Sequence, residues 1–379
     1  MVRLQDIAQW LRRVPIELRY TLLLFAITRA ALLIIGIVSR ILLDPFHIRY
    51  AGWNYSPSMW LGMWGVWDSG WYLDIAQHGY SSIINAHGEA NYGFFPLYPL
   101  LMKYLGYIVG NTYIAGLVIS NICLIISGVY LYKLVRTSYD TETSHRSITY
   151  LFLFPTAFIL SAALSESVFL LLLILSFYYA ARGSYMPSGI FGFFLTLTRP
   201  VGIAALIPLA YLYLKQKKFA LRKIRPDALW LILFPAALVI FCVFCYHLTG
   251  DFFAYAHAQQ TGWGRVFGNP LAVLLTNMLS KNINHSFSAY YALFSIIIIL
   301  IGLKRIGLSY TLIALLLILI PLSTHVLSMP RYSAVIFPYF ILFSLWGKNR
   351  YIDQSIIAFC SILLGFLMVM WVNGFLLMV

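Results

Sequence analysis

Long apolar segments alternate with short charged segments along the whole chain. The apolar segments cover approximately residues 20–43, 112–134, 148–163, 165–181, 187–198, 200–214, 228–248, 287–303, 309–327, 332–346 and 355–378. A helix needs about 20 apolar residues to cross the hydrocarbon core of a bilayer. The pattern therefore predicts an all-α polytopic membrane protein with about eleven transmembrane helices, forming a single integral membrane domain over residues 1–379.

The four segments between residues 148 and 214 are shorter than a full crossing and contain Pro155, Pro200 and Pro208. Short, broken helices are tolerated in a membrane only where they line a cavity walled by protein or filled with water. We therefore expect these segments to surround a polar cavity. Arg29 lies inside the first span, where it is expected to face the bundle interior as a structural partner or as a substrate ligand.

Basic residues fall mainly in the short connections between apolar segments, and residues 215–225 form the most basic part of the chain. Such connections face the cytoplasm in multispanning proteins. We therefore expect a multi-pass protein of the cell (cytoplasmic) membrane, with a cytoplasmic N-terminus and an external C-terminus. Residues 1–19 combine four arginines with apolar residues, a pattern typical of an amphipathic helix at the cytoplasmic membrane surface.

This orientation places two longer connections outside the membrane. The first external loop, residues 44–111, contains tryptophans at positions 53, 60, 64, 67 and 71, and tryptophan favours the membrane–water interface. Its apolar segment 94–109 is short and contains Lys103, so we expect a re-entrant or interfacial helix. The second external loop covers residues 249–286.

Composition supports the membrane assignment and narrows the possible functions. Hydrophobic residues make up 61% of the chain and charged residues 10%, whereas soluble proteins contain roughly 25% charged residues. The net charge of +14 resides in the connections and not on a basic face with interleaved aromatics, so we expect no nucleic-acid partner. Cys242 and Cys245 form a CxxC pair, but they lie in an apolar helix, where buried thiols are the expected state.

The first external loop concentrates polar chemistry in the stretch WDSGWYLDIAQHGY, residues 67–80. Asp68 precedes a short predicted helix, where it is either an N-cap or a general base held in an apolar pocket. Asp74 and His78 are four residues apart, so they share a face of that helix and are expected to pair. The candidate catalytic residues are Asp68 and Asp74, and His78, Tyr80 and Trp71 are candidate substrate-binding residues.

Three further ionisable residues lie at the predicted outer ends of spans, namely Glu166, Arg199 and Arg331. Each arginine stands beside a proline break between two apolar segments. The guanidinium group offers a two-pronged donor that matches phosphate, so the pair indicates binding of an anionic headgroup, with anchoring of loops to lipid as the alternative. Glu166 is either a helix cap or a functional carboxylate in the same cavity.

Motifs for nucleotides and metals are missing from the sequence. It contains neither GxxxxGK[ST] nor a strand–GxGxxG–helix unit, and it contains no HExxH. We therefore expect no cofactor, no metal and no use of ATP.

The stretch WDSGWYLDIAQHGY, followed by NYGFFPLYPLL, closely resembles the signature of PIG-V-like mannosyltransferases, the family of the second GPI mannosyltransferase. The resemblance extends to LSESVFL, LTRPVG, FFAYAHAQQTGWGR and SMPRYSAVIFPYF, and therefore covers most of the chain. These proteins belong to the GT-C class of multispanning glycosyltransferases, so the resemblance implies a GT-C-like fold.

The resemblance also implies an inverting transfer of a sugar, typically mannose, from a polyprenyl- or dolichyl-phosphate donor to a hydroxyl of a lipid or glycan acceptor. An acidic residue of the first external loop acts as the base in that class, and Asp68 occupies the matching position, although Asp74 stays open as an alternative. Arg199 and Arg331 are the implied stabilisers of the leaving phosphate. Membrane lipids, and a possible partner subunit, are the further expected partners.

Two other functions remain alternatives. A transporter or flippase for a polyprenyl-linked lipid would also need a polar cavity and phosphate-binding arginines, but related halves are expected in a transporter and none are evident. A structural scaffold in a larger envelope complex would explain the spans but not the polar stretch in the first external loop.

Overall fold

The computed structural model describes residues 14–43, 55–375 and 377, and this part of the chain is helical without any strand. The predicted all-α fold is therefore confirmed. The predicted amphipathic helix at residues 1–19 lies largely outside the described residues, as does Trp53. The longer helices are α2 (Ile16–Leu43), α4 (Ser69–His78), α5 (Leu97–Val109), α6 (Thr112–Arg136), α7 (Thr141–Leu153), α8 (Glu166–Ala181), α9 (Tyr185–Thr198), α10 (Leu206–Gln216), α11 (Leu233–Thr249), α12 (Ala254–Trp263), α13 (Pro270–Met278), α14 (Ile283–Ile306), α15 (Leu308–Leu322), α17 (Pro338–Trp346) and α18 (Arg350–Val372).

Five of the described helical segments are long and apolar enough to cross a membrane, namely α2, α6, α14, α18 and Pro226–Thr249, which joins the 3-10 helix η6 (Pro226–Ile232) to α11. The helices α5, α8 and α15 are apolar but shorter. The chain is therefore an integral membrane protein with several spans, whereas the predicted number of about eleven is not confirmed.

Prolines explain two of the differences from the predicted spans. The predicted span at 148–163 breaks after Leu153, because Pro155 lacks an N–H and forces the residue before it into an extended conformation. The 3-10 helix η3 (Ala157–Ser161) follows the break. The predicted span at 332–346 is likewise divided, into the short helix α16 (Met329–Ser333) and α17, which begins at Pro338.

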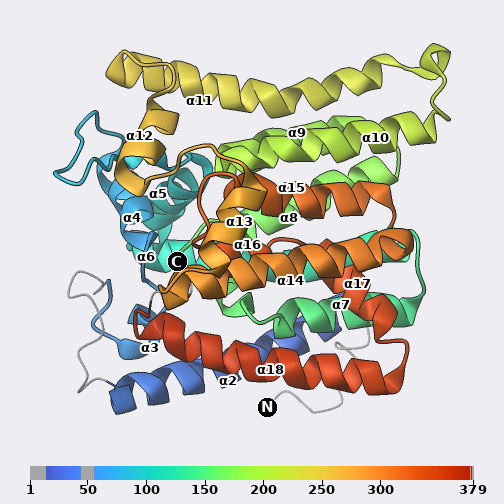
Figure 1. The fold of residues 1–379 in the computed structure, drawn as a ribbon, viewed down its shortest axis with the longest axis horizontal. Coiled ribbons are helices and arrows are strands. Elements are labelled where there is room, and N and C mark those ends of the chain that lie inside the picture. The colour runs from blue at the N-terminus through green and yellow to red at the C-terminus, as the bar shows by residue number, and fades with distance from the viewer. Residues whose placement is uncertain (1–13, 44–54, 376, 378–379) are drawn as a thin grey trace.

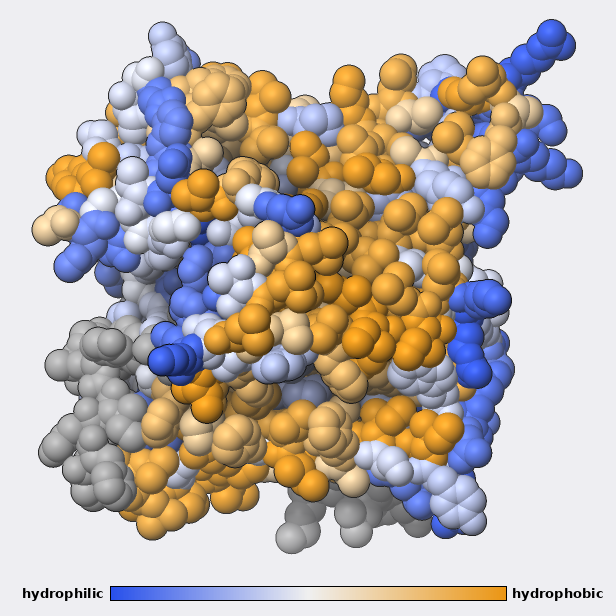
Figure 2. Space-filling view, in the orientation of Figure 1, coloured by the Kyte–Doolittle hydropathy of each residue, from blue (hydrophilic) through white to orange (hydrophobic). Residues whose placement is uncertain are grey.

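The longer helices lie side by side with roughly parallel axes, and α4, α5 and α12 gather at one end of the bundle (Figure 1). The connection between α10 and α11 lies at the opposite end. Figure 2 shows a broad apolar surface across the middle of this face, with hydrophilic residues concentrated toward the two ends. This distribution fits a protein whose middle is embedded in lipid and whose two ends reach water.

Helix α8 occupies the centre of the bundle. Every residue from Glu166 to Phe177 is buried, and the helix packs against α6 and α9. A helix that is apolar on all sides is stable only when other helices surround it. Because α8 begins at Glu166, this packing places the carboxylate of Glu166 deep inside the protein.

Arg29 of α2 reaches the break that follows α7. Its Nη1 donates to the carbonyl of Ala157 at 3.1 Å and to the hydroxyl of Ser161 at 2.8 Å. The 3-10 helix η3 leaves carbonyl groups without helical partners, and Arg29 supplies a donor to one of them. The sequence left Arg29 as either a structural partner or a substrate ligand, and these contacts support the structural role.

Glycines allow α9 and α11 to approach closely, and this contact gives a test of the fold. A Cβ at Gly192 of α9 would overlap the ring of the fully buried Phe234 of α11. Gly192→Ala is therefore expected to destabilise the protein by about 1–3 kcal/mol through overpacking. The measurement is the thermal unfolding midpoint of purified protein. Gly365→Ala is the matched control, since the nearest atom to its Cβ is Ile35 Cδ1 at 3.6 Å; equal midpoints for both variants would contradict the predicted packing.

Candidate active site

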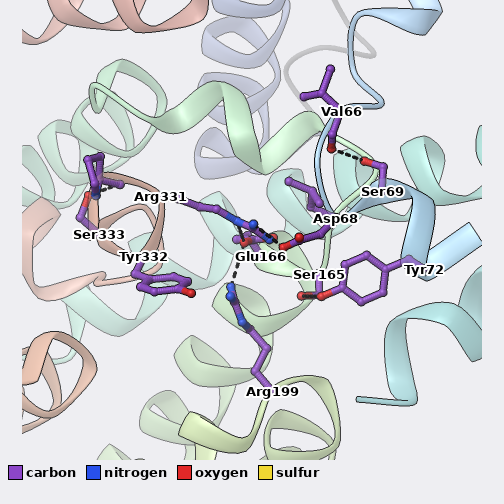
Figure 3. A network of polar contacts seen from close by, with 12 residues as sticks. Val66, Asp68, Ser69, Tyr72, Ser165, Glu166, Arg199, Arg331, Tyr332 and Ser333 are labelled. Atoms are coloured by element: carbon purple, nitrogen blue, oxygen red, sulfur yellow. Dashed lines mark hydrogen bonds and ion pairs between the residues drawn. The ribbon is translucent and has the colours of Figure 1, made fainter. Parts of the chain in front are cut away.

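Two carboxylates and two arginines from four separate segments meet at the end of the bundle that holds α4 and α12 (Figure 3). Arg331 Nη1 lies 2.5 Å from Asp68 Oδ2, and Arg331 Nε lies 2.5 Å from Glu166 Oε1. Arg199 Nη1 lies 2.8 Å from the same Glu166 oxygen. Arg331 therefore joins the two carboxylates, and Glu166 joins the two arginines. We call Asp68, Glu166, Arg199 and Arg331 the ionic cluster.

Asp68 stands at the N-cap position of α4, but its side chain makes no capping hydrogen bond. Its carboxylate instead points to Arg331, and the Asp68 side chain keeps 26% of its surface exposed. The neighbouring hydroxyl of Ser69 donates to the carbonyl of Val66 at 3.0 Å, which closes the turn before the helix. Asp68 is thus the member of the ionic cluster that is most accessible to solvent.

The backbone is strained beside both ends of the Asp68–Arg331 pair. Trp67, directly before Asp68, has φ 57°, and Ser328, three residues before Arg331, has φ 67°. A bulky side chain rarely adopts this left-handed conformation, which persists only where the surrounding structure imposes it. Such strain is concentrated at functional sites in proteins. The fold therefore holds both charges in place at a conformational cost.

Arg199 enters the cluster because of the proline that follows it. A residue before proline avoids the helical conformation, and Arg199 has extended backbone angles that end α9. The next helix, η4 (Pro200–Ala205), begins at that proline. Glu166 is placed differently, in the first turn of α8, where the partial positive charge of the helix N-terminus favours a carboxylate.

A tyrosine and a third arginine extend the cluster. Arg265 Nη2 donates to the hydroxyl of Tyr332 at 2.7 Å, and the guanidinium carbon of Arg199 lies 5.0 Å from the centre of the Tyr332 ring. On the other side, the hydroxyls of Tyr72 and Ser165 are 2.8 Å apart. Tyr332 therefore links Arg265 to the ionic cluster.

The charges around this site sum to an excess of one positive charge, because three arginines face two carboxylates. Two buried polar atoms of the cluster, Glu166 Oε2 and Arg331 Nη2, have no hydrogen-bond partner within the described part of the chain. Buried polar atoms are nearly always bonded in native proteins, so these two atoms are available to bond a ligand or an ordered water. The site is thus suited to an anionic ligand that also offers hydrogen-bonding groups.

The predicted second external loop packs onto the predicted first external loop beside this site. Gln259 Nε2 donates to the carbonyl of Gly93 at 2.8 Å, and the Trp263 ring lies edge-on to Trp71 and Phe94, with centroids 5.6 and 5.4 Å apart. These contacts hold the segment that carries Arg265 against the first loop. At the start of the second loop, a hydrogen bond from His257 lowers the pKa of the Asp251 carboxyl.

Asp74 and His78 lie apart from the ionic cluster. They form the expected pair, with His78 Nδ1 3.0 Å from Asp74 Oδ1, and both side chains are exposed. Asn91 Nδ2 donates to the other Asp74 oxygen at 2.9 Å. Asp74 and Asp68 therefore have different partners in the structure.

Trp71 and Tyr80, the two aromatic candidates for substrate binding, pack against other aromatic residues. Trp71 stacks on Phe94, with ring centroids 5.6 Å apart and 18° between the planes. The Tyr80 hydroxyl donates to the carbonyl of Phe94 at 2.8 Å, and its ring packs near Phe244. Both side chains support the junction of these two loops.

Four residues near the cluster were not selected from the sequence, namely Tyr72, Ser165, Arg265 and Tyr332. The position of Tyr72 near the cluster could have been predicted, since Tyr72 follows Asp68 by four residues and so lies on the same side of α4. Arg265 belongs to the ionisable residues that the predicted topology places outside, but only tertiary packing brings it to Tyr332. Within the described residues, no group of three or more His, Cys, Asp or Glu side chains could hold a metal ion.

Comparison with solved structures finds a similar fold in the oligosaccharyltransferase of Archaeoglobus fulgidus. Its crystal structure in the apo form gives a TM-score of 0.50 at 12% identity, over 93% of this chain and 56% of that chain. A complex of the same enzyme with Zn and sulfate gives 0.45 at 14% identity, over 91% and 53%. A complex of AglB from this archaeon with an inhibitory peptide and a dolichol-phosphate gives 0.43 at 12% identity, over 92% and 56%.

The apo structure supports the GT-C-like fold expected from the sequence. The likeness concerns the fold alone, and the chain spans little more than half the length of that enzyme. No model of a protein family matches the sequence, and no curated protein matches it.

Proposed function

We propose that the protein is an inverting membrane glycosyltransferase that uses a polyprenyl- or dolichyl-phosphate sugar as donor. The observation that carries this proposal is the ionic cluster, in which an accessible carboxylate and a set of arginines are held together by a buried glutamate. A base and a phosphate-binding group are the two parts that such a reaction needs. The fold shared with an oligosaccharyltransferase agrees with this reaction class.

In the proposed reaction, the acceptor hydroxyl attacks the anomeric carbon on the face opposite the donor phosphate. The hydroxyl proton passes to Asp68 as the new glycosidic bond forms. The bond from the anomeric carbon to the phosphate oxygen breaks, and its electron pair remains on the phosphate. Arg331 donates a hydrogen bond to Asp68 Oδ2 and so orients the carboxylate. Oδ1 is the oxygen that we assign to the acceptor proton.

The arginines stabilise the charge that collects on the departing phosphate. Arg199 and Arg331 are each bound to Glu166, whereas Arg265 bonds the neutral hydroxyl of Tyr332. A donor phosphate competes well for Arg265, because a charge-assisted hydrogen bond is roughly twice as strong as one to a neutral group. We therefore assign phosphate binding to Arg265 together with Arg199 and Arg331.

Mannose as the transferred sugar, and a hydroxyl of a lipid or glycan as the acceptor, rest on the resemblance to PIG-V-like mannosyltransferases. The same resemblance and the distribution of basic connections support a reaction on the external side of the cell membrane, with the N-terminus in the cytoplasm. Neither a metal nor a nucleotide takes part in the proposed reaction.

The proposal is tested with purified protein reconstituted in lipid vesicles. The substrates are polyprenyl-phosphate mannose, radiolabelled in the sugar, and a pool of cellular lipids and glycans. We expect labelled acceptor and free polyprenyl phosphate to form in equal amounts, because each transfer releases one phosphate. Movement of intact donor across the bilayer without release of polyprenyl phosphate would instead support a flippase. Heat-denatured protein is the control.

A further inference from the structure

Helix α4 separates the ionic cluster from a second polar region. Asp68 precedes the helix, and Tyr72 faces Ser165 on the side of the cluster. Gly70, Asp74, Gln77 and His78 recur at the spacing of one helical face, and they line a cavity of about 330 Å³ on the other side of α4. This volume is at the lower end of the range for ligand pockets, about 300–1,000 Å³. We call it the α4 cavity.

The lining of the α4 cavity combines aromatic rings with amide, carboxylate and imidazole groups. Tyr55 and Tyr113 form one wall, with ring centroids 5.6 Å apart. Gln77 and Asn111 add amide groups, and the Asp74–His78 pair adds further hydrogen-bonding atoms. Sugars present apolar C–H faces to aromatic rings and hydroxyls to carboxylates and amides.

The charge of the cavity distinguishes it from the ionic cluster. No arginine or lysine is present among the described residues that line it, whereas three arginines surround the cluster. The donor phosphate therefore has its electrostatic partners in the cluster and none among the described residues that line the α4 cavity. A neutral, hydroxyl-rich ligand fits the α4 cavity better than a phosphate does.

Gly70, in the first turn of α4, lines the cavity near Asp68. A Cβ at Gly70 would lie 2.7 Å from the hydroxyl oxygen of Tyr55, so a larger residue there would displace the end of the Tyr55 side chain. Gly70 is two residues from Asp68 in the chain. The cavity therefore extends to the end of α4 at which Asp68 stands.

A second cavity of about 360 Å³ adjoins the first and shares Gln77 and Asn111 with it. Tyr107 of α5 lines this second cavity, and it belongs to a strongly exposed apolar face that also includes Tyr104 and Ile108. Such a face is typical of a helix at the membrane interface. The two cavities therefore open beside the membrane surface.

We propose that the α4 cavity binds the acceptor, as a neutral carbohydrate, on the face of α4 opposite the donor phosphate. This assignment rests on the proposed function, because only a transferase needs an acceptor next to Asp68. In this arrangement the acceptor approaches Asp68 from one side of α4 and the donor phosphate from the other.

The test uses Gln77→Leu, which removes a half-exposed amide common to both cavities. Saturation-transfer NMR measures binding of methyl α-mannopyranoside to the full-length protein in nanodiscs of neutral lipid. We expect the wild type to transfer saturation to the glycoside and Gln77→Leu to lower the signal at least fivefold. Gln354→Leu, the same change at an exposed site on α18, is expected to keep the wild-type signal. Equal signals from all three proteins would overturn the proposal.

Steady-state kinetics separate this proposal from the proposed function. With a working transfer assay, Gln77→Leu is expected to raise the KM for acceptor at least tenfold and to leave the KM for donor unchanged. A rise in the donor KM alone would overturn the acceptor assignment. If no transfer is detected although glycoside binding still depends on Gln77, the proposed reaction fails, and the α4 cavity remains a carbohydrate site without an acceptor role.

Discussion

Arg331→Met is expected to destabilise the protein by about 3–5 kcal/mol and to abolish sugar transfer. Arg331 is 2% exposed and bonds both Asp68 and the fully buried Glu166. Its removal leaves Glu166 with Arg199 as its remaining partner in the cluster. Loss of one partner from a buried ion pair is strongly destabilising, because Glu166 stays out of water with only part of its charge compensated.

The thermal unfolding midpoint of the purified protein measures this effect. Arg305→Met is the matched control, since Arg305 is exposed at the end of α14. The double variant Glu166→Met/Arg331→Met separates charge from packing, because it removes both members of the buried pair. We expect it to be more stable than Arg331→Met and equally inactive. A single variant as stable as the Arg305→Met control would show that the cluster does not hold the fold together.

The positions of the longest helices could be predicted well from the sequence. The apolar segments at 20–43 and 112–134 agree with α2 and α6 within a few residues. The length and hydropathy of these segments make them predictable, because a helix must be long and apolar to cross a bilayer. The shorter segments were less predictable, because hydropathy alone does not show that a proline ends a helix, as Pro155 does after Leu153.

Three members of the ionic cluster could be anticipated because each lies at the predicted outer end of a span. Glu166, Arg199 and Arg331 are far apart in the chain, but the alternating direction of the spans brings such ends to one side of the membrane. The direct bonds through Glu166 were not predictable, because they depend on the rotation of α8 about its axis. The contact of Arg265 with Tyr332 was not predictable for a similar reason, since its position depends on how α12 packs against the first loop.

Helix geometry also bears on which of Asp68 and Asp74 is the general base. Six residues separate them, which corresponds to about 240° around a helix of 3.6 residues per turn. The two carboxylates therefore project to different sides of α4, as their contacts with Arg331 and His78 show. In the proposed reaction Asp68 acts on the acceptor hydroxyl, whereas Asp74 belongs to the wall of the α4 cavity.

Asp68→Asn is accordingly expected to lower kcat by a factor of about 10²–10⁴, the usual contribution of a general base. The amide has the same shape as the carboxylate and still accepts a hydrogen bond from Arg331, but it cannot take the acceptor proton. Asp74→Asn is expected to act mainly on the KM for acceptor. Initial rates at saturating and limiting acceptor concentrations distinguish these two effects.

Glu142→Gln serves as the control for this comparison, since Glu142 is 77% exposed at the start of α7 and its pair with Arg146 is on the surface. Surface pairs of this kind contribute little to stability, so full activity is expected. The Asp68→Asn protein must also keep a wild-type unfolding profile, because a lost fold would imitate a lost base. A folded Asp68→Asn protein with full kcat would exclude Asp68 as the base and would reduce its role to holding Arg331 in place.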